Sequence, residues 1–209
     1  FMFNIIEKDI TNFSTIKTRA YAKYFCIINN LDDLIQAINF SKEKQINYKM
    51  LGKGSNILFS KEHYDNLLFL KLGKAFNFFN VEKKYVHIGA SHSLIQAGRK
   101  LLSLGYEDFM FFNLIPANIG GAVRQNAGVG NGQEIRDLLF SCTLYDVKDN
   151  KVIELKNNNL EFSYRNSIIK KNPNRYLILS SKFILDNRTD NISELLINMK
   201  NRVKEKIDR

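Results

Sequence analysis

The segment Leu51-Gly52-Lys53-Gly54-Ser55-Asn56 follows an apolar run, and a second glycine-bearing segment lies further along the chain, Ile115-Pro116-Ala117-Asn118-Ile119-Gly120-Gly121-Ala122-Val123. Residues without bulky side chains let backbone amides approach an anion, and the positive end of a following helix adds to the attraction. We therefore predict that the two segments form the two sides of a cradle for a nucleotide diphosphate. The alternative is that each segment is only a tight turn.

Two common phosphate motifs do not account for these segments. The first segment lacks the spacing of Gly-x-x-x-x-Gly-Lys-Ser/Thr, and it also lacks the third glycine of Gly-x-Gly-x-x-Gly. These patterns mark nucleoside triphosphatases and the usual dinucleotide-binding folds. The sequence therefore indicates a different kind of nucleotide site.

The composition is that of a globular protein, with 209 residues of which 44% are hydrophobic and a formal net charge of +10. That length is enough for one large domain or two small ones. The lysines are scattered and lack interleaved aromatic residues, so the charge favours anionic small molecules over nucleic acid. No run approaches the roughly 18 apolar residues of a membrane span, and the first residues lack a signal-peptide pattern. We expect a cytoplasmic monomer without nucleic-acid or membrane partners.

The cysteines and histidines predict no metal site. Cys26 and Cys142 both lie in apolar, β-branched stretches, which is typical of buried thiols rather than of a disulfide framework. The three histidines have no partner at the spacing of metal ligands. We therefore expect structural roles for both cysteines and no bound metal.

Hydrophobic periodicity predicts two halves of different architecture. In the first half, strand 24–28, a helix capped by Asn30 and strand 46–51 form a βαβ-like unit, which places the first glycine segment at the carboxyl end of a strand. In the second half, short alternating runs across residues 67–90 predict antiparallel strands. The further predicted elements are a helix capped by Ser93 and stopped by Gly105, a hairpin of strands 141–147 and 151–155, strand 176–185 and an amphipathic helix over 190–208.

Four motifs occur in the order and rough spacing of one family: LGKGSNIL at 51–58, IPANIGGAVRQNAG at 115–128, Glu134-Ile135, and Tyr164-Arg165-Asn166-Ser167. Over residues 10–207 the chain resembles the UDP-N-acetylenolpyruvoylglucosamine reductases. The resemblance implies an α+β fold, namely a FAD-binding domain of the PCMH type, like that of vanillyl-alcohol oxidase. Its parts would be a small α/β subdomain at 1–72, a mainly antiparallel subdomain at 73–188, and a C-terminal helix at 189–209 leading toward a substrate-binding domain.

The resemblance also implies FAD as the cofactor. The pyrophosphate would be held by Gly52, Lys53, Gly54, Ser55, Asn56 and Ile57. The flavin and the remaining phosphate would be met by Ile115, Pro116, Ala117, Asn118, Gly120, Gly121, Ala122, Gln125, Asn126, Ala127 and Gly128. From the residues alone, the glycine pair lets the chain lie against a planar ring, and Asn126 offers a donor and an acceptor to its polar edge. The alternative for the glycine pair is a helix-packing contact.

The implied reaction belongs to peptidoglycan synthesis, where NADPH serves as hydride donor for reducing UDP-N-acetylglucosamine enolpyruvate to UDP-N-acetylmuramate. Arg165 would stabilise negative charge that develops on the substrate carboxylate, because a forked, permanently charged guanidinium suits that task. Tyr164 would bind the UDP-sugar substrate beside it. Without the family context, an exposed Tyr-Arg pair is the simpler interpretation.

Part of the family's catalytic machinery has no counterpart in this sequence. The family's proton-donor serine lies in Gly-Ser-x-Phe-Lys-Asn-Pro, and a catalytic glutamate lies near the end of the third domain; neither motif occurs among the 209 residues. We therefore expect this chain to be the flavin-binding part and to be inactive alone. Three alternatives remain: another flavin oxidoreductase of the same superfamily, a flavin-binding module without catalysis, and a basic nucleic-acid-binding protein.

Overall fold

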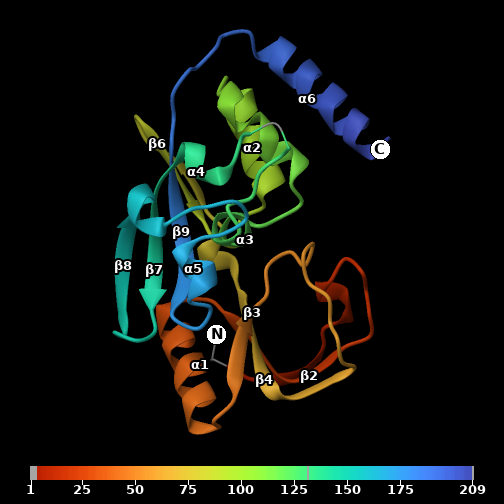
Figure 1. Ribbon diagram of the computed structural model, residues 1–209, viewed down its shortest axis with the longest axis vertical. Coiled ribbons are helices and arrows are strands. Elements are labelled where there is room, and N and C mark those ends of the chain that lie inside the picture. Colours follow the sequence, from red (N-terminus) through yellow and green to blue (C-terminus); the bar gives the residue numbers. More distant parts are fainter. Residues whose placement is uncertain (1–3, 131, 209) are drawn as a thin grey trace. The chain divides into compact units, whose positions relative to one another are not determined.

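The computed structural model describes residues 4–130 and 132–208. By its internal contacts the chain separates into two compact units, Phe1–Asn77 and Phe78–Arg209. Among the described residues each unit contains one β-sheet, and helices pack on it (Figure 1). The first unit carries the first glycine segment, and the second unit carries the other three sequence motifs.

The sheet of the first unit is mixed. Its strands, in chain order, are β1 (Ile6–Asp9), β2 (Tyr21–Ile28), β3 (Asn47–Met50) and β4 (His63–Leu72). In space the order is β1-β2-β4-β3, with β4 parallel to both of its neighbours and β1 antiparallel to β2. Two short 3-10 helices, η1 (Thr11–Phe13) and η2 (Lys74–Phe76), and helix α1 (Leu31–Glu43) complete the unit.

Helix α1 begins where its predicted cap lies. The side chain of Asn30 accepts a hydrogen bond from the backbone N–H of Asp33 at 2.8 Å, which satisfies one of the free donors of the first turn. Asp33 in turn accepts from the N–H of Asn29 at 2.8 Å. The helix buries Leu34 and Ile38 and packs on β2 and β3. The predicted helix is therefore confirmed.

The prediction of antiparallel pairing from residue 67 onward is wrong for its first strand. Residues 67–72 form the second half of β4, which pairs parallel with β2 and β3. Leu68, Phe69 and Leu70 are all buried, as expected of a central strand covered on both faces. An apolar run of this length predicts a buried strand but not its partners, because pairing is decided by segments distant in sequence.

The sheet of the second unit is antiparallel throughout. Its strands are β5 (Phe79–Val81), β6 (Tyr85–Gly89), β7 (Leu139–Asp146), β8 (Lys151–Lys156) and β9 (Tyr176–Ile184), in the spatial order β5-β6-β9-β7-β8. The helices are α2 (Leu94–Ser103), η3 (Glu107–Leu114), α3 (Ile119–Arg124), α4 (Ile135–Leu138), η4 (Asn157–Leu160), α5 (Ile168–Lys171) and α6 (Ile192–Ile207). The predicted hairpin is confirmed as β7 and β8.

Aromatic side chains fill the core beside the central strand β9. Phe109 and Phe112 of η3 meet edge to face with ring centroids 5.1 Å apart, and Phe112 meets Phe183 of β9 at 5.4 Å. All three side chains are fully buried. Such geometry adds a specific attraction to the burial of apolar area.

Both cysteines are buried and free, as predicted. Burial raises the pKa of each thiol to about 12, so both stay protonated and unreactive near neutral pH. In the described part of the chain, no group of three His, Cys, Asp or Glu side chains is arranged to hold a metal ion.

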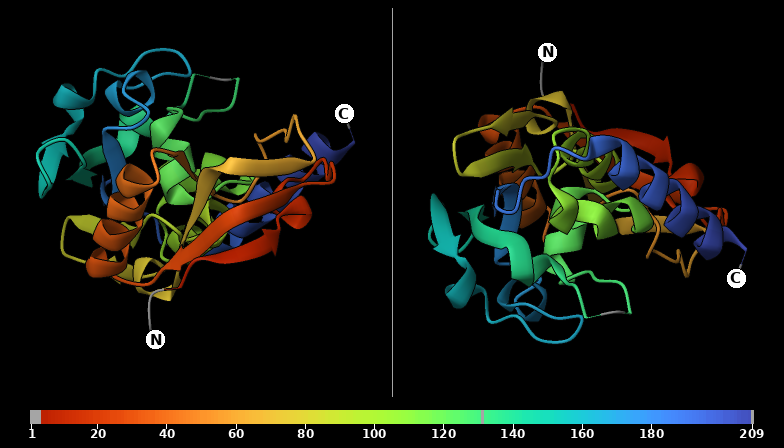
Figure 2. Two further views of the ribbon diagram at one scale, coloured as in Figure 1. Left: turned by 90° about the horizontal axis from the view of Figure 1, so that it is seen from below. Right: turned by 90° about the horizontal axis from the view of Figure 1, so that it is seen from above.

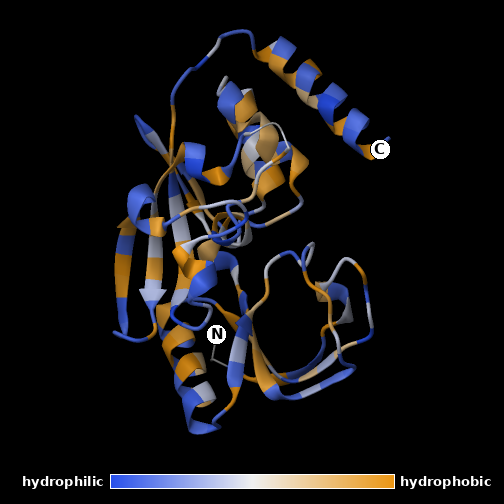
Figure 3. Cartoon of the chain, in the orientation of Figure 1, coloured by the Kyte–Doolittle hydropathy of each residue, from blue (hydrophilic) through white to orange (hydrophobic). Residues whose placement is uncertain are grey.

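The last helix, α6, is amphipathic, with apolar and polar stripes along its length (Figure 3). It lies against η3 and α2, where Leu195 packs with Leu102 and Met110 (Figure 2). Helix α2 ends as predicted before Gly105, whose φ is +91° and whose added Cβ would lie 2.2 Å from the Thr189 carbonyl oxygen. Among the helices of residues 4–130 and 132–208, none combines the length and apolar composition needed to cross a membrane.

We predict that Phe183→Ala lowers the free energy of unfolding by about 3 to 5 kcal/mol, because truncation opens a cavity in a close-packed aromatic cluster. Ile184→Ala, at the next residue of β9 on the half-exposed face, should change it by only about 0.5 kcal/mol. Denaturant unfolding followed by circular dichroism measures both. Equal losses in the two variants would contradict the assignment of Phe183 to the core.

Candidate functional site

The first glycine segment lies in the loop between β3 and β4, and residues 13–15 hold this loop through backbone and side-chain contacts. The N–H of Thr15 donates to the Gly54 carbonyl at 3.1 Å, and the Ser14 hydroxyl donates to the Ile57 carbonyl at 2.6 Å. Gly54 has a φ of +83°, and a Cβ there would lie 2.0 Å from the Phe13 carbonyl oxygen. The protein's own packing therefore requires glycine at position 54. No helix follows this loop directly, so the predicted help from a helix dipole applies only to the second segment.

At Gly52, unlike Gly54, the fold itself does not require glycine. No protein atom lies within 4 Å of the position its Cβ would take, and its φ is outside the left-handed region. Glycine is thus required here neither by backbone conformation nor by protein packing. The backbone at Gly52 is thus open to close approach by a ligand, and the exposed Ser55 and Asn56 follow in the same loop.

A cation near this loop was missed by the sequence analysis. The ammonium of Lys71 on β4 donates to the Gly52 carbonyl at 3.3 Å and lies 5.1 Å from the centre of the Phe13 ring. Burial lowers the pKa of Lys71. The only signal in the sequence is a single lysine inside the apolar run 67–72, which is otherwise typical of a buried strand. The structure places its positive charge at the first glycine segment.

The two glycines of the second segment have different surroundings. Asn118 precedes α3, whose first N–H groups are already used, because Ile119 donates to His92 and Gly120 donates to Ala90, each at 2.9 Å. A Cβ at Gly120 would lie 3.1 Å from that of Ala90, so Gly120 serves a close packing contact. At Gly121 no protein atom lies within 4 Å of the Cβ position. The packing alternative therefore accounts for Gly120, while Gly121 faces open space.

The Asn126 side chain is engaged inside the protein. It is fully buried, with a backbone φ of +44° that asparagine tolerates well. Its amide group donates to the Glu134 carboxylate at 2.9 Å and to the Ser163 carbonyl at 3.1 Å, and its oxygen accepts from the N–H of Arg136 at 3.1 Å. Since an amide has only two N–H donors, none remains for the ring edge that we expected it to meet. In this structure Asn126 instead links the loop after α3 to the turn that begins at Ser163.

That turn carries the Tyr-Arg motif. Ser163 and Asn166 exchange backbone hydrogen bonds of 3.2 and 3.0 Å, with Tyr164 and Arg165 between them. Arg165 has a φ of +53°, at a turn position where glycine or asparagine is favoured. Holding another residue there costs about 1 to 3 kcal/mol, and such strain occurs mainly at functional sites. Lys17, Gln45 and Glu161 have similar positive φ values, so the role of Arg165 has to be argued from its contacts.

The structure brings Arg165 onto Gly128, the last residue of the motif at 115–128 and 37 residues earlier in the sequence. Its Nη2 donates to the Gly128 carbonyl at 2.9 Å, and the guanidinium lies 5.6 Å from the ring centre of Tyr164. Tyr164 is 81% exposed, so its ring is open to a ligand. Within the described residues no carboxylate forms an ion pair with Arg165. Its hydrogen-bond acceptor at Gly128 is a neutral carbonyl.

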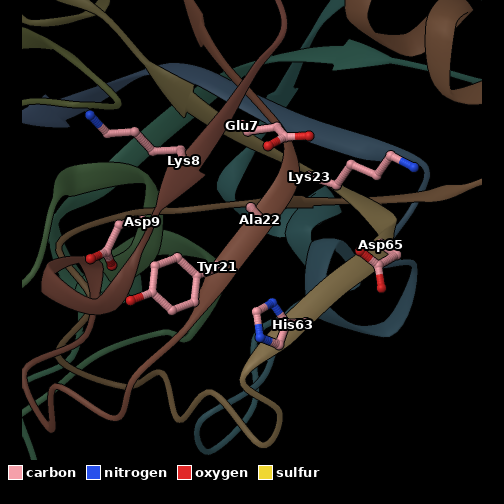
Figure 4. A pocket seen from close by; sticks show the side chains of 8 residues that line it. All are labelled: Glu7, Lys8, Asp9, Tyr21, Ala22, Lys23, His63 and Asp65. Carbon is pink, nitrogen blue, oxygen red and sulfur yellow. The ribbon is translucent and has the colours of Figure 1, made fainter.

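The hollow drawn in Figure 4 is a separate feature of the first unit. It measures about 410 Å³ and lies over β1, β2 and β4, where the Tyr21 and His63 rings stack with centroids 5.5 Å apart. Its walls carry both acids and lysines, and none of the predicted site residues lines it. The mixed charges give it no preference for an anion, so we do not assign the site to it.

Comparison with known proteins agrees with this geometry. Residues 22–156 match the FAD binding domain family. The UDP-N-acetylenolpyruvoylglucosamine reductase of Caldicellulosiruptor saccharolyticus is 30% identical over 179 residues, covering 86% of this chain and 56% of the relative. The enzyme of the same name from Clostridium novyi is 34% identical over 184 residues, covering 87% and 56%. The chain thus spans about half the length of the curated relatives it matches.

Solved structures show the same fold. The UDP-N-acetylenolpyruvylglucosamine reductase of Thermus caldophilus superimposes with a TM-score of 0.79 at 20% identity, over 97% of this chain and 70% of that one. A 6-hydroxy-D-nicotine oxidase from Arthrobacter nicotinovorans gives 0.58 at 12% identity, over 80% and 37%. The predicted α+β fold of the PCMH type is confirmed, and so is the resemblance to the reductases. The chain belongs to the FAD binding domain family, in the form found in UDP-N-acetylenolpyruvoylglucosamine reductases.

Proposed function

We propose that this chain is the flavin-binding part of an enzyme that reduces UDP-N-acetylglucosamine enolpyruvate to UDP-N-acetylmuramate at the expense of NADPH. The observation that carries the proposal is the contact of Arg165, whose Nη2 lies 2.9 Å from the carbonyl of Gly128 at the end of the motif at 115–128. The names of the relatives support the same activity. When bound, FAD supplies the hydride transfer that amino-acid side chains cannot perform.

For the first glycine segment we propose contact with the pyrophosphate of FAD. The open space at Gly52 admits a phosphate close to the backbone, and the exposed side chains of Ser55 and Asn56 add hydrogen-bond donors. Lys71 contributes positive charge through its position at the Gly52 carbonyl. Gly54 acts indirectly, because it sets the loop against residues 13–15.

For the second segment we propose contact with the flavin and the remaining phosphate. Gly121 has open space where a side chain would be, so a planar ring can approach the backbone there. Asn126 acts by shaping the loop that leads to Gly128 and Glu134. We propose that residues 1–72 and 73–188 are the two flavin-binding subdomains. The helix at 189–209 would lead toward a substrate-binding domain.

Arg165 and Tyr164 are proposed to act on the substrate. The forked guanidinium of Arg165 would stabilise negative charge developing on the substrate carboxylate. The exposed ring of Tyr164 would contact the UDP-sugar. We further propose that the enzyme works as a cytoplasmic monomer without nucleic-acid or membrane partners, and that its product supports cell-wall synthesis and thereby cell shape and division.

The two glycines of the first segment should respond differently to a methyl group. Gly54→Ala should lower the free energy of unfolding by about 1 to 3 kcal/mol, because alanine is strained at this φ. Gly52→Ala should leave stability unchanged and weaken FAD binding about tenfold, which is 1.4 kcal/mol. Flavin fluorescence titration and denaturant unfolding separate the two effects. Wild-type FAD affinity in Gly52→Ala would exclude close backbone approach there.

Replacement of Arg165 tests the catalytic role. In the full-length protein, Arg165→Ala should reduce substrate-dependent NADPH consumption by about 10² to 10³-fold, the usual effect of removing one preorganised charge donor. Visible flavin absorbance should show that FAD remains bound. Arg202→Ala on the exposed face of α6 is the matched control and should keep full turnover. Unchanged turnover in Arg165→Ala would refute the assigned role.

A further inference from the structure

Lys170, in the short helix α5, joins Arg165 to Gln125 of the motif at 115–128. Its ammonium donates to the backbone carbonyl of Arg165 at 2.9 Å and to the side-chain oxygen of Gln125 at 2.9 Å. Both acceptors are neutral, and within the described residues no carboxylate forms an ion pair with Lys170. The ammonium of Lys170 therefore orients two groups of the site, the Arg165 carbonyl and the Gln125 side chain.

A second set of contacts holds α5 in the position that these bonds require. The Ser167 side chain is fully buried; its hydroxyl donates to the Arg124 carbonyl at 2.8 Å and accepts from the N–H of Lys170 at 3.2 Å. Arg124 directly precedes Gln125. The helix that carries Lys170 is therefore attached to the same segment that Lys170 itself contacts.

Arg165 is consequently held at both ends. Lys170 holds its backbone carbonyl, and the Gly128 carbonyl holds its guanidinium. With a φ of +53°, the backbone of Arg165 is in a conformation that arginine does not favour by itself. The Lys170 contact adds to the backbone bonds between Ser163 and Asn166, and it is the one that reaches the Arg165 carbonyl itself.

We propose that Lys170 is a positioning residue, whose ammonium fixes the strained turn so that the Arg165 guanidinium meets the anionic group of the substrate. This rests on the proposed function, in which Arg165 stabilises negative charge on the substrate carboxylate. In this role Lys170 acts through Arg165, whose backbone carbonyl its ammonium contacts.

The neighbouring lysine provides a matched control. Lys171 lies in the same helix, but its ammonium forms an exposed ion pair with Glu161 at 3.1 Å. Lys171→Met and Lys170→Met therefore remove the same charge from adjacent positions. Only the second change removes contacts to Arg165 and Gln125.

In the full-length holoenzyme, Lys170→Met should lower kcat by about 10 to 100-fold, since misplacement of a reacting group by about 1 Å has effects of that size. Flavin reduction by NADPH, measured by stopped flow without substrate, should keep its rate, and FAD affinity should stay within about twofold. Lys171→Met should match the wild type in all three. A loss of the same size in flavin reduction or in Lys171→Met would overturn the proposal.

A double-mutant cycle separates positioning from a general structural role. If Lys170 acts through Arg165, the variant with both Lys170→Met and Arg165→Ala should be no slower than Arg165→Ala alone. Multiplied losses would show that Lys170 acts independently of Arg165 and would overturn the proposal. Lys170→Arg, which keeps a cationic donor, should recover part of the lost kcat.

A structural measurement tests the positioning role of Lys170 even if the proposed function is refuted. Absence of substrate-dependent NADPH consumption in the wild-type holoenzyme would refute the proposed function. Crystal structures of Lys170→Met and Lys171→Met would still test the positioning role directly. The contact between Arg165 Nη2 and the Gly128 carbonyl should be lost in the first and kept in the second; its survival in Lys170→Met would refute the inference.

Discussion

The candidate site depends on a set of hydrogen bonds between the loop after α3 and the turn at residues 163–166. Asn126 binds the Ser163 carbonyl at one end of this set, and Arg165 binds the Gly128 carbonyl at the other. Two of these residues, Asn126 and Arg165, have positive φ values. Such conformations persist only where surrounding contacts determine them, so the bonds between loop and turn are what keep the site in shape.

Different physical reasons account for glycine at different positions of the two motifs. Gly54 is needed for its left-handed backbone, and Gly120 is needed because Ala90 lies against it. Gly52 and Gly121 have neither reason, since open space surrounds their Cβ positions. At each of these two positions, taken separately, the backbone is open to the approach of a ligand, as the proposed contacts with FAD require.

The three cationic side chains described here share one kind of partner. Lys71, Lys170 and Arg165 all direct their cationic groups to neutral carbonyl or amide oxygens. A neutral acceptor orients a cation without cancelling its charge, and such charge acts strongly on an anion where water is partly excluded. Lys71 thereby places a cationic group at the first glycine segment, and Arg165 and Lys170 place theirs at residues 125–128.

The sequence by itself determined the faces of strands and helices, the caps of α1 and α2, the β7–β8 hairpin and the family motifs, because these depend on local periodicity and on residue types. Only the tertiary structure decided that β4 lies between β2 and β3, that Gly120 packs while Gly121 is open, and that Asn126 is buried with its amide fully used. Lys71 and Lys170 likewise acquire their roles only from contacts with distant residues. Such pairings are set by long-range packing, which no local pattern of residues specifies.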